Sequence, residues 1–357
     1  MWLLSRYDDV LVVIKDSERF SNVYVGKIPW TPKWMRPYYQ HILVRDPPDH
    51  TRLRALVGKA FTARMVEDLR ERIEILCDQL LTAAAAKSQM DLVSEYALAI
   101  PLTIIADLLS IPKGERRKFA AWTNKLAASS SGTLPDILKS LPSAWMFLRY
   151  FRNLTESHRT FQRDDLLSAL IRAEEAGDKL SEGELLGMVM LLLIAGYETT
   201  VNLIATGTLV LLENPEQREF FQNNPDGIDT AVEELLRYTS PADVASPRVA
   251  RVDVTVGSKT IRRGDIILLF LGSANRDASR FPDPDTLDLA RQPNKHLAFG
   301  AGAHFCVGAT LARLEGKVAL TKLFRRFPDL RLAVPSESLR WRRGLAFRGL
   351  RRLPVLT

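Results

Sequence analysis

Cys306 lies in a segment whose composition suits a reactive or metal-bound sulfur. The segment reads HLAFGAGAHFCVGATLARLE over residues 296–315, with glycines on both sides of the cysteine and His304 two residues before it. A helical pattern begins directly after Cys306, and the positive end of a helix dipole stabilises an anionic thiolate. Glycines lose much conformational freedom on folding, so several in one loop indicate an unusual backbone conformation or a close approach.

Four roles for Cys306 fit this pattern to different degrees. A free cysteine is usually a small buried apolar side chain, which is our interpretation of Cys77 on an amphipathic helical stretch. A catalytic nucleophile needs a well-placed base and zinc needs tetrahedral ligands; the spacing of His296, His304 and Cys306 favours neither. A thiolate ligand to haem iron accounts for every feature, because a flat porphyrin can approach a glycine-rich backbone.

The stretch FGAGAHFCVG resembles the haem-binding loop of the cytochromes P-450, the haem-thiolate monooxygenases. The other motifs follow in that family's order, and the resemblance covers essentially the whole chain. It implies that Cys306 is the axial ligand of the iron in haem b. It also implies that Phe299 screens the sulfur from solvent and that three further loop residues contact the haem, namely Gly300, His304 and Gly308.

A second motif, AGYETT at residues 195–200, lies in a long apolar helical stretch. It resembles the family's oxygen-activation motif, which implies that Ala195 contacts the haem, Thr199 hydrogen-bonds dioxygen and Glu198 helps to deliver protons. Cleavage of the O–O bond needs two protons in a dry pocket, so an acid beside a hydroxyl suits the reaction. We therefore expect Thr199 and Glu198 to be the catalytic side chains.

Two sets of charged residues are expected to hold the loop and the cofactor. Glu234 and Arg237, in EELLRY, are three residues apart on one helix and can touch. By resemblance they form a buried structural network with Arg291. The two propionates of haem need cations, and arginine can bind a carboxylate through two hydrogen bonds. Four residues match the family's propionate-binding positions: His50, Arg54, Arg248 and His304.

The substrate is expected to be an apolar small organic molecule. The resemblance places the loop at residues 20–41 in the pocket lining, and this lining is largely apolar. Macrolides, terpenoids, steroids and fatty acids all fit such a pocket. The remaining residues of the expected lining are Met190, Ile194, Val244, Ala245, Ala346 and Phe347.

The hydrophobic pattern predicts a mainly helical chain with a smaller β part, an α+β class, in a single domain over residues 1–357. Short alternating runs after Pro241 and at the C-terminus predict strands. Helices are predicted at about 48–61, 63–81, 92–109, 113–128, 136–157, 164–176, 181–213, 227–238 and 307–327. The helix at 181–213 begins with a capping-box pattern, Ser181-x-x-Glu184. By resemblance, haem lies between this central helix and the helix that follows the cysteine loop.

Composition places the chain among soluble globular proteins. It has 357 residues, two cysteines and a net charge of +7, from 49 Lys and Arg against 42 Asp and Glu. Two cysteines exclude a disulfide framework and suit a reducing compartment, and the N-terminus does not resemble a signal peptide. The apolar run at residues 185–196 is short for a membrane span, and no nucleic-acid motif is recognised. We expect a cytoplasmic monomer that binds neither membrane nor nucleic acid.

The resemblance implies a bacterial-type monooxygenase of secondary metabolism that inserts one atom of dioxygen into its substrate, by hydroxylation or epoxidation. A peroxide-driven peroxygenase and a non-catalytic haem sensor are the alternatives, and the pair Glu198 and Thr199 argues against the first. Electrons are expected from a separate ferredoxin or flavodoxin with its reductase. Basic residues are expected to meet this acidic partner, namely Arg52, Lys59, Arg64, Arg313, Lys317, Lys322, Arg325 and Arg326.

The chain departs from the family pattern at its start. The family normally has several tens of residues before the segment that matches WLLSRYDDV, and Met1 stands almost at that point. We expect the family's first helix and edge strand to be missing. This expectation bears on pocket closure and stability, and leaves the haem motifs unaffected.

Overall fold

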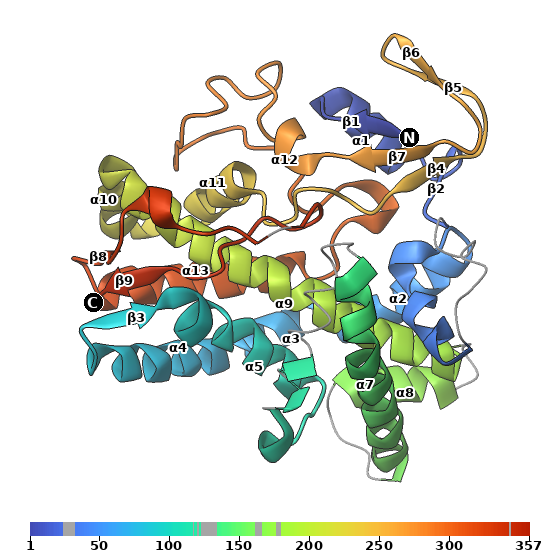
Figure 1. The fold of residues 1–357 in the computed structure, drawn as a ribbon, viewed down its shortest axis with the longest axis horizontal. Helices are drawn as coiled ribbons and strands as arrows, with labels where there is room; N and C mark the ends of the chain where they lie inside the picture. The colour runs from blue at the N-terminus through green and yellow to red at the C-terminus, as the bar shows by residue number, and fades with distance from the viewer. Residues whose placement is uncertain are drawn as a thin grey trace.

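The computed structural model describes residues 1–23, 33–116, 118–119, 121–122, 134–160, 166–175, 180–342 and 344–357. The long helix α9 (Glu182–Glu213) runs through the middle of the protein, and most of its residues are buried (Figure 1). Its N-terminus has the predicted capping box, because Ser181 Oγ accepts the Glu184 amide and the Glu184 carboxylate accepts the Ser181 amide. By length and composition α9 is able to cross a membrane, but it is mostly buried and is therefore a core helix.

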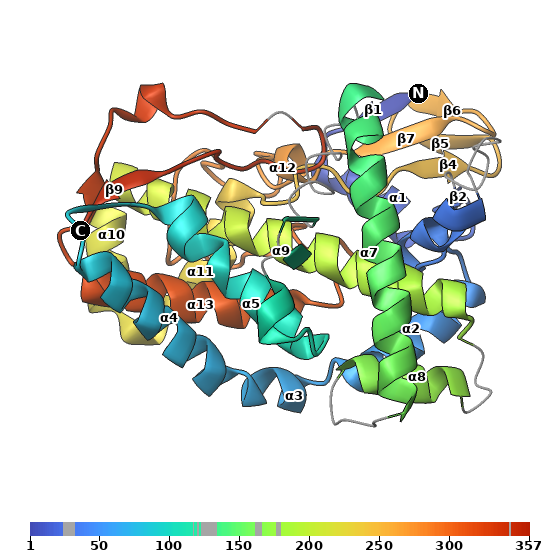
Figure 2. The same cartoon turned by 60° about the horizontal axis from the view of Figure 1, so that its bottom comes forward.

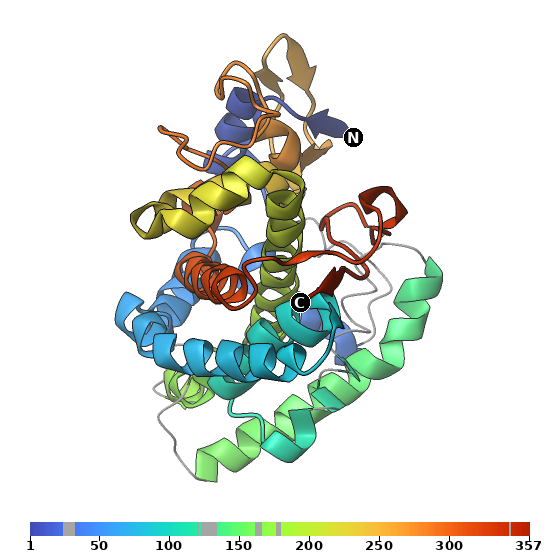
Figure 3. The same cartoon turned by 90° about the vertical axis from the view of Figure 1, so that its left-hand side faces the viewer.

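Other helices enclose α9. Helix α13 (Ala309–Arg326) lies on one side of α9 and α7 (Leu134–Thr160) on the other (Figure 3). Figure 2 shows α7 crossing in front of α9. Helix α4 (Arg70–Ala85) packs along α13. The remaining α-helices are α1 (Tyr7–Lys15), α2 (Asp49–Ala60), α3 (Ala63–Asp68), α5 (Ala99–Leu108), α8 (Leu166–Glu175), α10 (Pro215–Asn223), α11 (Ile228–Thr239) and α12 (Leu271–Ala274).

Two predicted helices differ from the structure, and a third is described only in part. The helix predicted at 63–81 is two helices, α3 and α4, which meet at Leu69; the apolar stripe continues across the break, so periodicity did not reveal it. The helix predicted at 92–109 opens with a π-helical turn, η4 (Val93–Ala97), before α5. In the helix predicted at 113–128, the described residues show η5 (Lys113–Glu115) and are α-helical at 116, 118–119 and 121–122; the other positions lie outside the described residues.

The strands form three small sheets, which confirms the predicted α+β class. One sheet has the order β1-β7-β4-β2, in which β1 (Trp2–Leu4) pairs parallel with β7 (Ile266–Leu269) and the other pairs are antiparallel. This sheet joins the start of the chain to its last third (Figure 1). The other strands are β2 (Phe20–Ser21), β3 (Gln89–Asp91), β4 (Arg248–Ala250), β5 (Val254–Val256), β6 (Lys259–Ile261), β8 (Arg331–Leu332) and β9 (Pro354–Leu356).

Candidate functional site

Helix α9 has one open stretch near its middle. Ala195 and Gly196 are exposed and Thr199 is partly exposed, although most of the helix is buried. Apart from the helix backbone, no atom lies within 4 Å of the point where a Cβ on Gly196 would stand. Thr199 Oγ1 donates to the Ala195 carbonyl at 2.8 Å, which keeps this side chain against the helix. These small residues therefore leave room beside the centre of α9, and we name Ala195, Gly196 and Thr199 the α9 window.

Cys306 ends the loop that precedes α13. Its amide donates to the Phe299 carbonyl at 2.9 Å, which closes the loop. The side chain is exposed, yet surrounding protein atoms bury the thiol enough to raise its pKa; the Gly308 amide and the charges of Arg54 and Arg313 lower it. Cys306 is thus an exposed residue whose thiol lies among protein atoms and near two cations.

The glycines of the cysteine loop meet different needs. Gly300 and Gly302 both have a φ of +68°, which L side chains rarely adopt. A Cβ on Gly302 would stand 3.0 Å from the Cα of Lys15, so this glycine also lets α1 approach the loop. Gly308 has an ordinary φ of −87°, and no atom lies within 4 Å of its Cβ position. Gly308 is thus the one of these three glycines that has an ordinary φ and open space at its Cβ position.

The residues predicted to bind propionates converge beside this loop. The rings of His50 and His304 have centroids 4.1 Å apart, and Arg54 Nη1 donates to the Phe305 carbonyl at 2.5 Å. Burial and the neighbouring positive charges lower the pKa of both histidines, that of His304 to about 3; the guanidinium of Arg248 contributes to both shifts. The Nε2 atoms of both histidines are buried and have no hydrogen-bond partner among the described residues. Two unpartnered imidazole nitrogens beside the guanidinium groups of Arg54 and Arg248 suit an anion.

The observed arrangement fits a haem group. The accessible sulfur of Cys306 is a suitable iron ligand, and the α9 window leaves space for a planar ring. The unsatisfied donors of His50 and His304 suit the two propionates. Helix α13, which follows the cysteine loop, packs directly against α9, so these features belong to one region of the molecule.

Glu198 is a buried acid beside the α9 window, with 4% of its surface exposed. Its Oε1 atom lies 3.4 Å from Nη1 of Arg342, and its Oε2 atom has no partner in the described part of the chain. Burial raises the pKa of Glu198, and Arg342 lowers it. Sequence reasoning found the acid and missed Arg342, because 144 positions separate the two residues and no motif joins them.

A second buried acid, Glu315 on α13, was also missed. It is 1% exposed, and its Oε1 atom has no partner among the residues described. Burial raises the pKa of Glu315 to about 8, and a hydrogen bond with Thr200 lowers it. Glu315 is therefore protonated at neutral pH. Its position nine residues after Cys306, on an amphipathic helix that packs against α9, was the available signal.

The predicted network around Glu234 is present and buried. Arg237 donates to both carboxylate oxygens of Glu234 at 2.7 Å, and Arg291 adds a bond of 3.1 Å. Arg237 also donates to backbone carbonyls of the segment 275–286, which ties this segment to α11. Asn294, which the sequence did not indicate, donates to Glu234 at 3.0 Å. These bonds agree with a structural role.

The predicted pocket residues from two distant segments meet in the structure. The Ala346 carbonyl accepts the amides of Asp243 and Val244, at 2.9 and 3.4 Å. Phe347 forms an isolated β-bridge with Ala242, two residues before Val244. Ala245 follows directly and donates to the Leu269 carbonyl at 2.9 Å. The two segments therefore form one continuous wall.

The other predicted pocket residues lie on α9 and in the 20–41 loop. Ile194 is partly buried and precedes the exposed Ala195. Met190, about one helical turn earlier, is 1% exposed and packs in the core. In the 20–41 loop, residues 24–32 lie outside the described residues.

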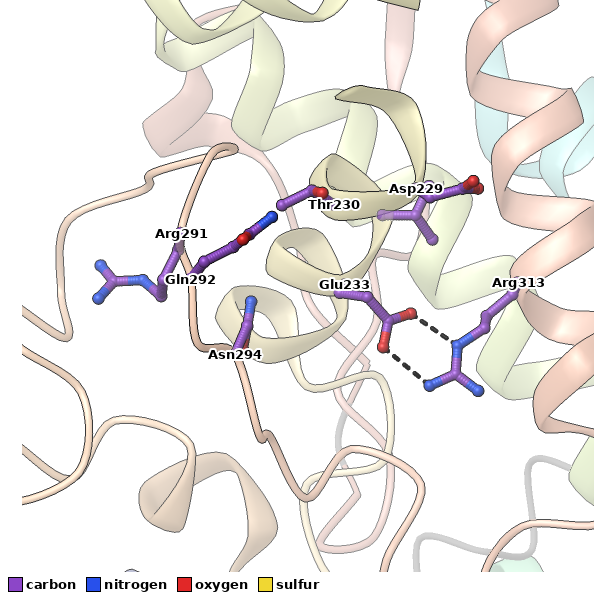
Figure 4. Close-up of a pocket in the computed structure, with 8 residues that line it drawn as sticks. Asp229, Thr230, Glu233, Arg291, Gln292, Asn294 and Arg313 are labelled. Atoms are coloured by element: carbon purple, nitrogen blue, oxygen red, sulfur yellow. Dashed lines mark hydrogen bonds and ion pairs between the residues drawn. The ribbon is translucent and has the colours of Figure 1, made fainter. Parts of the chain in front are cut away.

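Half of the eight basic residues expected to meet an acidic partner already pair with acids of this chain. Lys317 Nζ lies 2.6 Å from Asp229, Lys322 Nζ lies 2.7 Å from Asp78, and Arg52 lies 2.5 Å from Glu184. Arg313 forms two hydrogen bonds with Glu233 at the edge of a cleft of about 480 Å³ (Figure 4). The side chain of Lys59 is outside the description. Three are exposed and have no acidic partner within the described residues: Arg64, Arg325 and Arg326.

Comparisons with known proteins agree with this arrangement. A family model described as cytochrome P450 matches residues 1–228 and 226–335. The chain is 44% identical to cytochrome P450 107B1 of Saccharopolyspora erythraea and 42% identical to the polyketide biosynthesis cytochrome P450 PksS of Bacillus subtilis. Each match covers 99% of this chain and 88% of the relative. P450BioI, solved in complex with an acyl carrier protein ligated to hexadec-9Z-enoic acid, matches with a TM-score of 0.93 and 36% identity over 100% of this chain and 92% of that one. These similarities show that the chain belongs to the cytochrome P450 family.

Proposed function

We propose that this protein holds haem b through Cys306 and inserts one atom of dioxygen into an apolar small molecule, by hydroxylation or epoxidation. Membership of the family makes the protein a haem-dependent monooxygenase. The observation that carries the residue assignment is the sulfur of Cys306, enclosed by protein yet accessible to solvent. When bound, the haem would supply the oxidising chemistry, and the side chains described above would orient it and exclude water.

The chain's own residues stabilise the anionic sulfur and the propionates. The Gly308 amide and the positive charges of Arg54 and Arg313 favour the thiolate of Cys306. The buried donors beside the loop bind the propionates, and this would satisfy the unpartnered Nε2 atoms. The residues proposed to act in this way are His50, Arg54, Arg248 and His304.

Proton delivery is assigned to Glu198 and Thr199. Glu198 is buried, with one weak cationic partner, so its surroundings favour a protonated carboxyl that can release its proton. Thr199 lies at the open α9 window, where its hydroxyl can receive a proton and present it to the bound oxygen substrate. Together they would carry protons across a space from which the packed helices exclude bulk water.

The substrate class is proposed from the pocket wall and the relatives. PksS is named for polyketide biosynthesis, and P450BioI was solved with an acyl carrier protein bearing a fatty acid. We therefore place this protein in secondary metabolism, acting on a polyketide or a related acyl chain. Electrons would come from a ferredoxin or flavodoxin with its reductase in the cytoplasm, where the protein would act as a monomer. The exposed Arg64, Arg325 and Arg326 suit such acidic partners.

The assignment of Cys306 is tested by the spectrum of the reduced protein under carbon monoxide. The wild type should show the red-shifted Soret band of thiolate ligation, and Cys306→His should lose it. Cys77→Ala is the matched control, because Cys77 is buried on α4 away from the loop, and it should keep the band. A red-shifted band in Cys306→His would show that another residue binds the iron.

The proton-delivery role is tested by the fraction of electrons that reach product. Thr199→Ala and Glu198→Gln should bind substrate normally and divert electrons to hydrogen peroxide. Thr208→Ala is the control, since Thr208 makes the same hydroxyl bond to the carbonyl four residues earlier, at 2.8 Å, but is fully buried. Equal coupling in all three variants would exclude this role.

A further inference from the structure

The pair formed by Glu233 and Arg313 joins α11 to α13 next to the cysteine loop. Arg313 Nε and Nη2 donate to the two oxygens of Glu233 at 2.6 and 2.8 Å, and Figure 4 shows the two side chains facing each other. Burial would raise the pKa of Glu233, but its hydrogen bonds to Arg313 and His296 lower it to about 2. The pair is therefore ionised at neutral pH, and two hydrogen bonds fix its geometry.

Arg313 also lies over the ring of Phe299. Its guanidinium carbon is 4.5 Å from the ring centroid, within the range of a cation–π contact. The Phe299 carbonyl accepts the Cys306 amide, so the ring belongs to the loop that holds the sulfur. The charge of Arg313 acts on Cys306, and Arg54 acts on it as a second cation.

His296 holds the other side of Glu233. Its Nδ1 atom accepts the Ala298 amide at 3.2 Å, which places the ring proton on Nε2 when the imidazole is neutral. Nε2 lies 3.2 Å from Glu233 Oε2 and donates to it. Glu233 is thus fixed from two directions, and its position determines where the guanidinium of Arg313 stands.

We propose that Glu233 is a positioning residue that fixes Arg313 over Phe299, and that this oriented pair sets the reduction potential of the haem bound to Cys306. The inference rests on the proposed assignment of Cys306. One-electron reduction adds negative charge to the haem and its sulfur ligand. A nearby cation stabilises the reduced form, and the carboxylate of Glu233 offsets part of this effect.

Opposite substitutions should therefore shift the potential in opposite directions. Glu233→Gln leaves the charge of Arg313 unbalanced and should raise the potential. Arg313→Gln leaves Glu233 unbalanced and should lower it. We expect each to change the equilibrium constant for one-electron reduction by up to about tenfold, which corresponds to about 59 mV. Arg313→Lys keeps the charge and should shift the potential least.

Spectroelectrochemical titration of the purified holoprotein measures these shifts. Lys317→Gln is the matched control, because Lys317 joins the same two helices through Asp229 at 2.6 Å, and no contact links it to Phe299. Shifts in the same direction for Glu233→Gln and Arg313→Gln would show general loosening of the loop and overturn the proposal. Shifts no larger than that of Lys317→Gln would overturn it as well.

The carbon monoxide spectrum separates this inference from the assignment of Cys306. If the wild type lacks the thiolate band, the assignment itself fails. If every variant shows the band and the reduction potentials of the variants equal that of the wild type, the assignment of Cys306 stands and only the positioning role of Glu233 fails. If Glu233→Gln does not retain haem, Glu233→Asp shortens the side chain without removing its charge. A potential for Glu233→Asp equal to that of the wild type would then overturn the positioning role.

Discussion

The acids around this site fall into two groups, on α11 and beside the α9 window. Glu233 and Glu234 on α11 each receive two hydrogen bonds from an arginine fork. Beside the window, Glu198 has one contact of 3.4 Å with Arg342, and Glu315 has no cation among its described neighbours. The pKa values follow this division, because that of Glu233 falls to about 2 and that of Glu315 rises to about 8.

The difference separates two uses of a buried carboxyl group. A fully paired carboxylate stays ionised and fixes the elements that it joins, which here support the cysteine loop. An acid without a full partner retains its proton, because burial disfavours the charged form. The ion pairs of Glu233 and Glu234 with arginine thus lie on the side of the molecule that carries Cys306, and the acids able to exchange protons lie beside the α9 window.

The largest loss of stability should follow from breaking the ion pair between Arg237 and Glu234. Arg237→Met leaves the carboxylate of Glu234 buried without its fork, and both side chains are fully buried. We expect a loss of about 3–5 kcal/mol in the free energy of unfolding, together with loss of haem. Urea unfolding and haem content measure both effects. Lys317→Met removes a partly exposed pair and should cost less than about 1 kcal/mol; an equal loss in both variants would contradict the division.

Neutralising Glu315 should matter increasingly as pH rises above about 4.5. Its folded pKa, about 8, lies above its ordinary value of 4.5, so the free energy of unfolding should fall as pH rises between these values. Glu315→Gln cannot ionise and should be more stable than the wild type by roughly 2–4 kcal/mol at pH 9, with little difference at pH 4. Urea unfolding at both pH values checks this. An equal difference at the two pH values would show that Glu315 does not titrate in the folded protein.

Removing Arg342, the cation that contacts Glu198 among the described residues, should have a smaller effect. Arg342 lowers the pKa of Glu198, so Arg342→Gln should raise it and delay formation of the carboxylate to higher pH. We expect the yield of product per electron at pH 7 to fall about twofold to fivefold, because a carboxyl with a higher pKa releases its proton less readily, and we expect the loss to depend on pH. Arg348→Gln is the control, since Arg348 lies over Trp341 on the same segment. A loss in Arg342→Gln that is independent of pH would point to a purely structural effect.

The smallest effect concerns the surface cations. Arg326 is exposed and has no acidic partner among the described residues, whereas Lys317 is bound to Asp229. Arg326→Gln should therefore slow reduction by an acidic ferredoxin about twofold to threefold at low salt, and Lys317→Gln should slow it less. Stopped-flow reduction at several ionic strengths measures both rates. A rate that does not depend on salt would exclude electrostatic docking at this surface.

The sequence predicted those parts of the site that lie close together in the chain. The loop around Cys306 and the capping box of α9 are contiguous, and Glu234 and Arg237 are one helical turn apart. Their geometry follows from local spacing, which a helix or a tight loop preserves. The break between α3 and α4 at Leu69 was missed for the same reason, since the local apolar pattern continues across it.

The parts that were missed depend on which distant side chains meet. Arg342, in the C-terminal segment, contacts Glu198. Arg313, which the sequence analysis expected to meet a partner protein, is bound to Glu233. Glu315 stands on an amphipathic helix, where charged side chains usually face solvent, and the folded chain buries it. Charge pairing and desolvation are settled by tertiary packing, and neither is written in the spacing of one segment.

The C-terminal segment that folds back between Trp341 and Leu350 places two separate tasks on one short piece of chain. It carries Ala346 and Phe347 of the expected pocket wall, and it carries Arg342, the counterion of Glu198. On the proposed role of Glu198, libraries that randomise this segment with position 342 included are expected to vary the release of hydrogen peroxide as well as the product. Selection for a new substrate should keep Arg342 unchanged, so that differences in turnover reflect the shape of the pocket wall and not the loss of the Arg342 charge beside Glu198.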